Sequence, residues 1–181
     1  MKKNHSLLFF SFIILLSCKQ ENPKQCVMPS TQSINYGVEY LGNLDSAIQY
    51  SKCVNRPLVV FFTQLQAVSC RKMEAIILPS FWIKRKLNSE FVVVKVYVDD
   101  KAPISDTFYS EILDKTVETL GDKYFHYQLA EFKSASGPFF AILDTNQKSL
   151  VEFAYTPKKK DVIKFLDEAL LLFEKGQSKQ K

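Results

Sequence analysis

The residues best suited to chemistry lie between positions 58 and 77. An apolar run, LVVFFT, is followed by a short polar loop and then by Cys70 near the start of a predicted helix. A helix N-terminus stabilises a thiolate, because its free backbone N–H groups and dipole favour negative charge. A dithiol pair of the C-x-x-C type needs a second Cys at position 67, where this chain has Ala67. The segment therefore predicts either a single-thiol site or a thiol site without its nucleophile.

The elements around this segment follow from apolar periodicity and from breakers. Run 58–63 is rich in β-branched and aromatic residues and predicts a strand that is buried on both faces. Run 106–132 predicts a helix that Gly121 interrupts. In chain order we expect helix 44–53, strand 58–63, helices 68–77 and 81–87, strand 91–98, the helical segment 106–132, strands 138–143 and 150–155, and helix 159–175.

This order predicts an α/β fold. Parallel strands joined by helices and followed by an antiparallel hairpin give a central mixed sheet of four to five strands, with helices on both faces. That is the layout of thioredoxin.

Five stretches resemble the thioredoxin-like domains related to the C-terminal periplasmic domain of the membrane thiol:disulfide interchange protein. They are RPLVVFFT at 56–63, CRKME at 70–74, VYVDDK at 96–101, LGDK at 120–123 and GPFFAILD at 137–144. The resemblance extends from about residue 43 to 173 and lies in the order and spacing of these stretches.

The resemblance implies four parts of a redox site. The nucleophilic Cys falls at Ala67, the resolving Cys at Cys70, a buried acid at Phe61, and a proline, cis in the family, at Pro138. The two parts that attack and transfer protons are therefore absent. We interpret their joint loss as a degenerate site, because an acid buried without a partner is costly once no thiolate needs it.

The same resemblance implies a substrate groove that needs no cysteine. Ala67, Val68, Gly137 and Pro138 would form it, with Arg71 and Lys72 at the rim, and strand-like hydrogen bonds would hold an extended peptide. The first hypothesis is a binding module for an unidentified envelope protein or peptide. The alternative is a monothiol disulfide oxidoreductase that uses Cys70, and a third possibility is a purely structural envelope component.

Three cysteines follow position 18, so they cannot all pair with one another. Cys53 and Cys70 flank a six-residue strand of about 20 Å and should lie too far apart for a disulfide. Cys26 could reach either of them: a bond to Cys53 would attach the N-terminal segment to the body, and a bond to Cys70 would lock the site. Free thiols are also possible. We expect Cys70, one turn into its helix, to be partly buried.

The N-terminus predicts export and lipidation. MKK precedes a short apolar run, and LLSC at 15–18 resembles a bacterial lipobox, which implies cleavage before Cys18 and a lipid on its sulfur. We expect a lipoprotein signal at 1–17, a lipidated tether at 18–42, the domain at 43–175 and a basic tail at 176–181. The chain would be anchored in the cell envelope. The same resemblance implies the outer membrane, because Asp is absent just after Cys18, and the domain would face the periplasm.

Other kinds of site have little support in the sequence. The formal net charge is +5, and the basic residues form short runs typical of solvated faces, so we predict no nucleic-acid partner. The single His after the signal, His126, has no nucleophile elbow and is interpreted as structural. No metal-ligand spacing and no glycine-rich phosphate loop occur, so no metal or cofactor is predicted.

Overall fold

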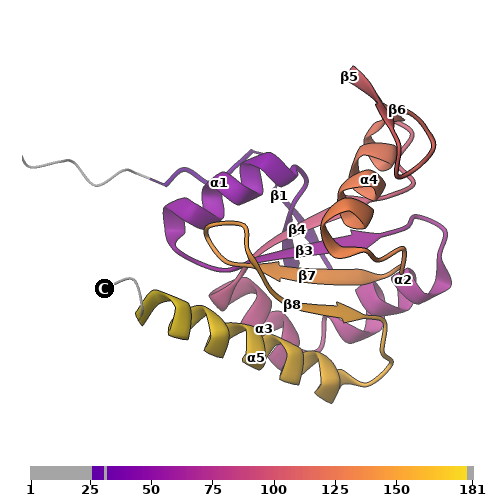
Figure 1. Cartoon of the computed structure of the whole chain (residues 1–181). Coiled ribbons are helices and arrows are strands. Elements are labelled where there is room, and N and C mark those ends of the chain that lie inside the picture. Colours follow the sequence, from indigo (N-terminus) through magenta and orange to yellow (C-terminus); the bar gives the residue numbers. More distant parts are fainter. Residues whose placement is uncertain (1–25, 31, 179–181) are drawn as a thin grey trace, which may run out of the picture.

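The computed structural model describes residues 26–30 and 32–178, and a six-stranded mixed sheet lies at its centre (Figure 1). Its spatial order is β1-β2-β4-β3-β7-β8. The strands are β1 (Gln32–Asn35), β2 (Val38–Leu41), β3 (Leu58–Thr63), β4 (Val92–Tyr97), β7 (Phe139–Leu143) and β8 (Ser149–Ala154). β3 runs parallel to β4 and antiparallel to β7, so the sheet is mixed as expected.

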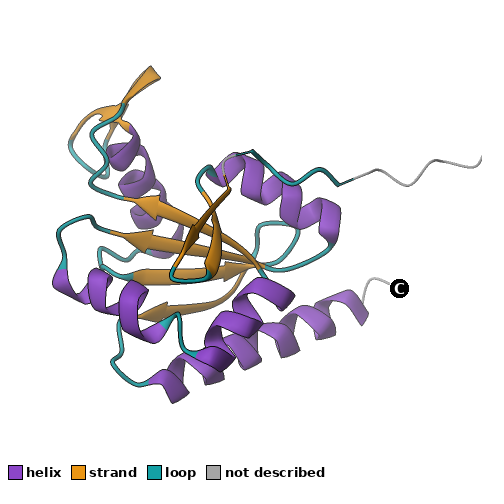
Figure 2. Ribbon diagram, turned by 180° about the vertical axis from the view of Figure 1, so that it is seen from behind, coloured by secondary structure: helices purple, strands orange, loops and turns teal. Residues whose placement is uncertain are grey.

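Helices cover both faces of this sheet, as the sequence predicted (Figure 2). On one face lie α1 (Leu44–Val54) and α4 (Leu120–Phe132). On the other lie α2 (Val68–Lys72), the π-helical turn η1 (Met73–Ile77), α3 (Phe81–Glu90) and α5 (Lys159–Ser178). None of the described helices is long and apolar enough to cross a membrane.

Strand β3 joins the two hydrophobic cores. All six of its side chains are buried. Val59 and Phe61 belong to the core beneath α3 and α5, whereas Val60 and Phe62 belong to the core beneath α1 and α4. Because β3 is buried on both faces, its sequence is a continuous apolar run and does not alternate between apolar and polar residues.

The folded body begins earlier than the sequence indicated. The predicted tether at 18–42 includes β1 and β2, which form an antiparallel hairpin at the edge of the sheet. The side chains of Val38, Tyr40 and Leu41 are buried, and β2 runs parallel to β4. The sheet therefore has six strands instead of the expected four to five. The sequence did not predict β1 and β2, because strands of four residues are too short for a periodicity signal.

The predicted helix over 106–132 is wrong in its first half. A separate hairpin, β5 (Pro103–Ser110) and β6 (Lys115–Thr119), precedes α4. Gly121 does not interrupt a helix, because it lies in the first turn of α4 and donates its N–H to the Asp100 carbonyl at 3.0 Å. A Cβ at this position would lie 2.5 Å from the Asp100 nitrogen. The glycine therefore permits the close approach of α4 to the chain after β4.

A disulfide joins Cys26 to Cys53, with their Cα atoms 5.7 Å apart. This confirms the first of the pairings that the sequence left open and excludes a Cys26–Cys70 bond. Cys53 lies in the last turn of α1 and is exposed. The predicted signal and Cys18 lie outside the described residues.

Candidate functional site

The candidate site is built where β3 gives way to α2. After Thr63, residues 64–67 form a loop, and Ala67 is the N-cap residue of α2 with extended backbone angles (φ −74°, ψ 124°). Its methyl group makes no side-chain cap hydrogen bond and is half-buried. The position that the resemblance assigned to the nucleophile therefore offers neither a thiol nor a hydroxyl.

Cys70 is the free cysteine among the described residues, and it is completely buried. Its sulfur accepts a hydrogen bond from the backbone N–H of Gln64 at 3.4 Å. The thiol thus points back toward the loop instead of into solvent. Its burial agrees with the expectation for a Cys one turn into the helix, where the side chain acts as a small hydrophobe.

An aromatic pair fills the position that the resemblance assigned to a buried acid. The ring of Phe61 has no exposed surface and stacks on Phe140 of β7, with centroids 4.4 Å apart and planes within 2°. Both rings belong to the core beneath α3 and α5. The position contributes packing and cannot accept a proton.

The proline of the site lies beside the start of α2. The Gly137–Pro138 peptide bond is cis, and Pro138 is buried. Ser69 donates its hydroxyl to the Gly137 carbonyl at 3.2 Å, which joins the first turn of α2 to this bond. The structure therefore brings together the four predicted groove positions, of which Val68 is the most exposed, at 68%.

Two side chains hold the loop at 64–67: Asp99, which sequence reasoning missed, and Arg71, which it placed at the rim of the groove. The Leu65 N–H donates to both carboxylate oxygens of Asp99, at 3.0 and 2.9 Å. Arg71 donates to the Gln64 carbonyl at 2.8 Å. Asp99 follows the end of β4 at Tyr97. Only the tertiary fold shows that the end of β4 lies against this loop.

A buried ionic cluster lies under α2 and η1. Glu74 is 3% exposed, and its carboxylate contacts Arg71 at 2.7 Å, Lys95 at 3.3 Å and the Thr63 hydroxyl at 3.0 Å. The sequence signal for this cluster was the single Lys inside the apolar strand VVVKVY. A charge within a buried strand requires a partner of opposite sign.

Aromatic rings surround the ammonium group of this cluster. Lys95 Nζ lies 4.7 Å from the ring centroid of Tyr40 and 5.3 Å from that of Tyr97. Such cation–π contacts replace part of the hydration that burial removes. Burial raises the pKa of the Tyr40 hydroxyl, and the negative charge of Glu74 raises it further.

His126 has a structural role, as the sequence indicated. Its Nδ1 lies 2.8 Å from the hydroxyl of Ser110, and its ring meets Phe108 edge to face. Ser110 is 1% exposed and also accepts the Leu113 N–H. The pair therefore fastens the β5–β6 hairpin to α4 and offers no accessible nucleophile. Among described residues, no group of three or more His, Cys, Asp or Glu side chains could hold a metal ion.

Comparison with known proteins identifies the fold. No protein-family model matches the sequence, and no curated protein matches it significantly. Among solved structures, the oxidoreductase DsbH is similar with a TM-score of 0.55 and 20% identity, over 84% of this chain and 94% of that one. A thioredoxin from Thermus thermophilus is similar with a TM-score of 0.54 and 16% identity, over 71% of this chain and 85% of that one. The chain therefore has a thioredoxin-like fold.

Proposed function

We propose that this protein is a lipid-anchored thioredoxin-fold module of the bacterial envelope that binds a protein or peptide segment without dithiol chemistry. One observation carries the proposal. The helix that should present a nucleophile has Ala67 at its N-cap, and the remaining thiol of Cys70 is buried and accepts a hydrogen bond from the loop. A buried thiol is an inert structural group rather than an attacking one.

The kinship that we propose is with thiol:disulfide interchange domains. The order of the five matching stretches supports it, as does the fold shared with an oxidoreductase. Lipid attachment at Cys18 rests on the sequence LLSC and on the basic, apolar segment before it. The outer membrane, with the domain facing the periplasm, is our proposed location.

The surface around the groove favours an extended, partly apolar segment. Val68 and Leu65 are exposed at 68% and 51%, and they lie on the two sides of Ala67 along the chain. Lys72 adds an exposed cation one turn further along. A strand-like backbone beside Gly137 could contact these apolar side chains, a mode of recognition that needs no thiol.

Photocrosslinking in cells tests the binding role. A photoreactive amino acid at Val68 should capture a partner whose adduct survives thiol reductants. The matched control is the same substitution at Val27, which is 78% exposed but lies beside the disulfide on another part of the domain. Adducts at both positions alike, or at neither, would contradict a specific groove. Val68→Asp should abolish recovery of the captured partner and leave the unfolding midpoint unchanged, since the side chain makes few contacts.

The alternative, a monothiol oxidoreductase that uses Cys70, is distinguished by reactivity. We expect Cys70 in the native protein to resist a small alkylating reagent and to react only after unfolding. Insulin reduction that Cys70→Ser abolishes would support the alternative and overturn the proposal.

A further inference from the structure

We propose that the amino-terminal parts of α3 and α5 form a membrane-binding surface, from which Phe81 and Trp82 enter the headgroup region of an anionic lipid leaflet. This surface consists of other residues than the groove, and it needs neither a thiol nor the lipid at Cys18. The inference therefore goes beyond the proposed function and can be tested on a chain that carries no lipid.

Two aromatic rings are exposed on the first turn of α3. Phe81 and Trp82 are exposed at 63% and 62%, and their rings meet edge to face with centroids 4.9 Å apart. The opposite side of the helix is packed, because Ile83 and Leu87 are buried in the core beneath α3 and α5. The two rings therefore do not serve the core. Adjacent large apolar side chains left in water indicate a surface that a partner covers.

Helix α5 lies beside α3 and runs in the same direction (Figure 1). β3 and β8 are both antiparallel to β7, so the chain leaves both strands at the same end of the sheet. From that end α3 and α5 each run back along the same face. Lys86 on α3 pairs with Asp167 on α5 at 2.8 Å. Trp82 and Ile163 lie one turn before these two residues, so the amino-terminal parts of the helices are neighbours.

The two neighbouring segments are strongly basic. Segments 81–86 and 158–164 contain seven Lys or Arg residues and one acidic residue, Asp161. They therefore carry more net positive charge than the whole chain, whose formal net charge is +5. The three lysines at 158–160 are all exposed. The aromatic pair thus has a cationic surrounding.

Most of these cations have no partner within the protein. In the part of the chain that the structure describes, Lys86 is the one of the seven that forms ion pairs, with Asp167 and with Glu90. Arg85 is exposed and follows Phe81 by one turn, so the ring and the guanidinium group share the outer face of α3. The surface therefore offers apolar rings and unpaired positive charge side by side, and a partner should have the complementary chemistry.

An anionic lipid leaflet fits both features. Trp and Phe rings are stable at the level of the lipid headgroups, where one part of the ring is in an apolar layer. Long Lys and Arg side chains keep their charged ends at the phosphates. Anionic lipids also attract clusters of basic residues electrostatically. A soluble polyanion would satisfy the cations but would leave the rings in water.

Trp82 reports this contact directly, because it is the single Trp of the chain. The protein to use is the chain from residue 18 with Cys18→Ser, which carries no lipid and retains every described helix and strand. With vesicles that contain phosphatidylglycerol, we expect the Trp emission to shift to the blue and brominated lipid tails to quench it. Vesicles of phosphatidylcholine alone should leave the emission unchanged, and salt should weaken binding by screening.

Two variants locate the surface. Phe81→Asp removes an apolar ring, and Arg85→Glu reverses a charge. Each should lower the partition of the protein onto anionic vesicles, measured by co-sedimentation, at least about tenfold. Both side chains are exposed, so the unfolding midpoints should stay close to that of the parent.

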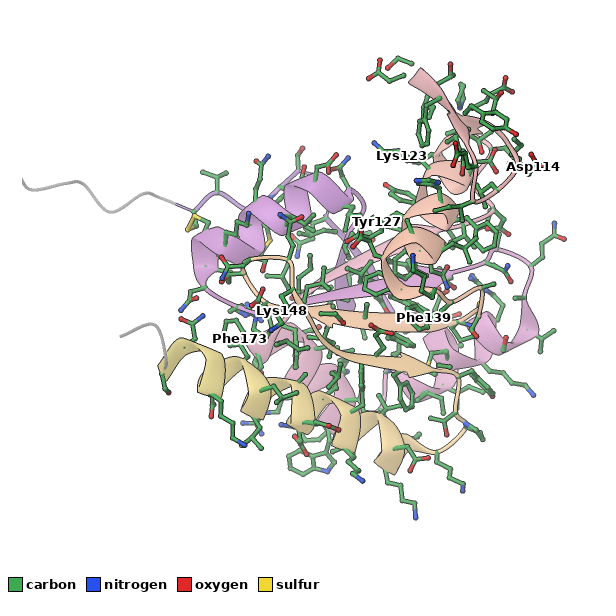
Figure 3. The ribbon with its side chains drawn as sticks, in the orientation of Figure 1. Asp114, Lys123, Tyr127, Phe139, Lys148 and Phe173 are labelled. Carbon is green, nitrogen blue, oxygen red and sulfur yellow. A yellow bond between two sulfur atoms is a disulfide. The ribbon has the colours of Figure 1, made fainter. Side chains whose placement is uncertain are left out.

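Matched controls place the same changes elsewhere. Tyr109→Asp alters an aromatic residue that is 61% exposed and donates to Asp114 in the β5–β6 hairpin. Figure 3 labels Asp114 on the part of the molecule opposite to α3 and α5. Lys148→Glu reverses the charge of an exposed Lys in the β7–β8 turn, which lies at the other end of the sheet because Leu143 pairs with Leu58. Both controls should bind nearly as tightly as the parent.

Four results would overturn the proposal. Emission could respond to both kinds of vesicle alike or to neither, or the controls could lose as much binding as the variants. A blue shift that grows with protein concentration in the absence of vesicles would assign the rings to a contact between two copies. Binding to heparin as tight as to vesicles, without a shift in emission, would show that the cations act alone. The photocrosslinking at Val68 uses other residues, so the groove is judged separately.

Discussion

Lys95 lies directly opposite Phe61 in the β3–β4 ladder, yet its ammonium group pairs with Glu74, 3.3 Å away on η1. The buried charge of β4 is thus balanced from the helix layer and not from the neighbouring strand. Phe61 is left free to stack on Phe140. The ion pair links η1 to β4 directly beneath the candidate site, so its contribution to stability can be tested apart from any role of the thiol.

Removing the carboxylate should destabilise the fold strongly. In Glu74→Gln, Lys95 and Arg71 lose their negative partner, and Lys95 is 8% exposed in its side chain. Leaving a buried charge unpaired costs about 3–5 kcal/mol. We expect the free energy of unfolding in urea to fall by about this amount, with far-UV circular dichroism as the probe.

A paired substitution is the control for this experiment. Glu74→Gln/Lys95→Met removes both charges of the buried pair and should recover much of the loss, because a buried ion pair replaced by apolar groups is often neutral. If the double variant were less stable than Glu74→Gln, the pairing would not explain the cost.

Stability should fall at alkaline pH because of Tyr40. Burial raises the pKa of its hydroxyl above the ordinary value of 10.0. Below pH 10 the hydroxyl is protonated in both states, so its contribution is fully present. Above pH 10 the unfolded chain releases the proton while the native protein keeps it, and the free energy of unfolding falls by up to about 1.4 kcal/mol per pH unit.

Urea titrations between about pH 9 and about pH 11 would measure this slope. Tyr40→Phe should have a shallower slope and keep the aromatic face beside Lys95. Part of the slope should remain, because burial also raises the pKa values of Tyr124 and Tyr127. An unchanged slope in the variant would refute the role of Tyr40.

Two glycines in helices should respond in opposite ways to alanine. At Gly121 a Cβ would meet the Asp100 backbone nitrogen at 2.5 Å and oxygen at 2.7 Å, so Gly121→Ala should destabilise by about 1–3 kcal/mol. At Gly176 nothing lies within 4 Å, so Gly176→Ala should be neutral or stabilise by up to about 1 kcal/mol. Thermal unfolding of both variants checks the pair, and equal effects would contradict the close approach of α4.

Long elements with a strong pattern could be predicted from the sequence. The helix at 159–175 matches α5, and the run at 58–63 coincides with β3. The hairpins β1–β2 and β5–β6 could not be predicted. β2 is buried because it pairs with β4, which is far away in the sequence. β5 is mostly exposed, so its sequence has no apolar face that would indicate a strand. Their stability comes from tertiary partners that a local pattern does not contain.

The same contrast holds within the candidate site. The positions at 67, 70, 137 and 138 followed from the family pattern, and the structure brings them together through the Ser69–Gly137 hydrogen bond. Asp99 and Glu74 were missed, because each acts through a partner far away in the chain: the Leu65 N–H for one and Lys95 for the other. A carboxylate whose partner lies far away in the chain forms no recognisable sequence motif, so the sequence does not predict such a contact.

Restoring the missing thiol tests whether the site has lost only its nucleophile. Ala67→Cys places a thiol at the N-cap of α2, three residues before Cys70, where the helix N-terminus favours a thiolate. We expect this variant to gain dithiothreitol-dependent insulin reduction that the parent lacks, and to form an internal disulfide that mass spectrometry detects after oxidation. Phe61 leaves it without a proton acceptor, so turnover should be slow. Ala67→Ser is the matched control and should stay inactive, because a hydroxyl cannot exchange with disulfides. If the parent reduced insulin as fast as Ala67→Cys does, Cys70 would already perform the exchange, and the site would not be degenerate.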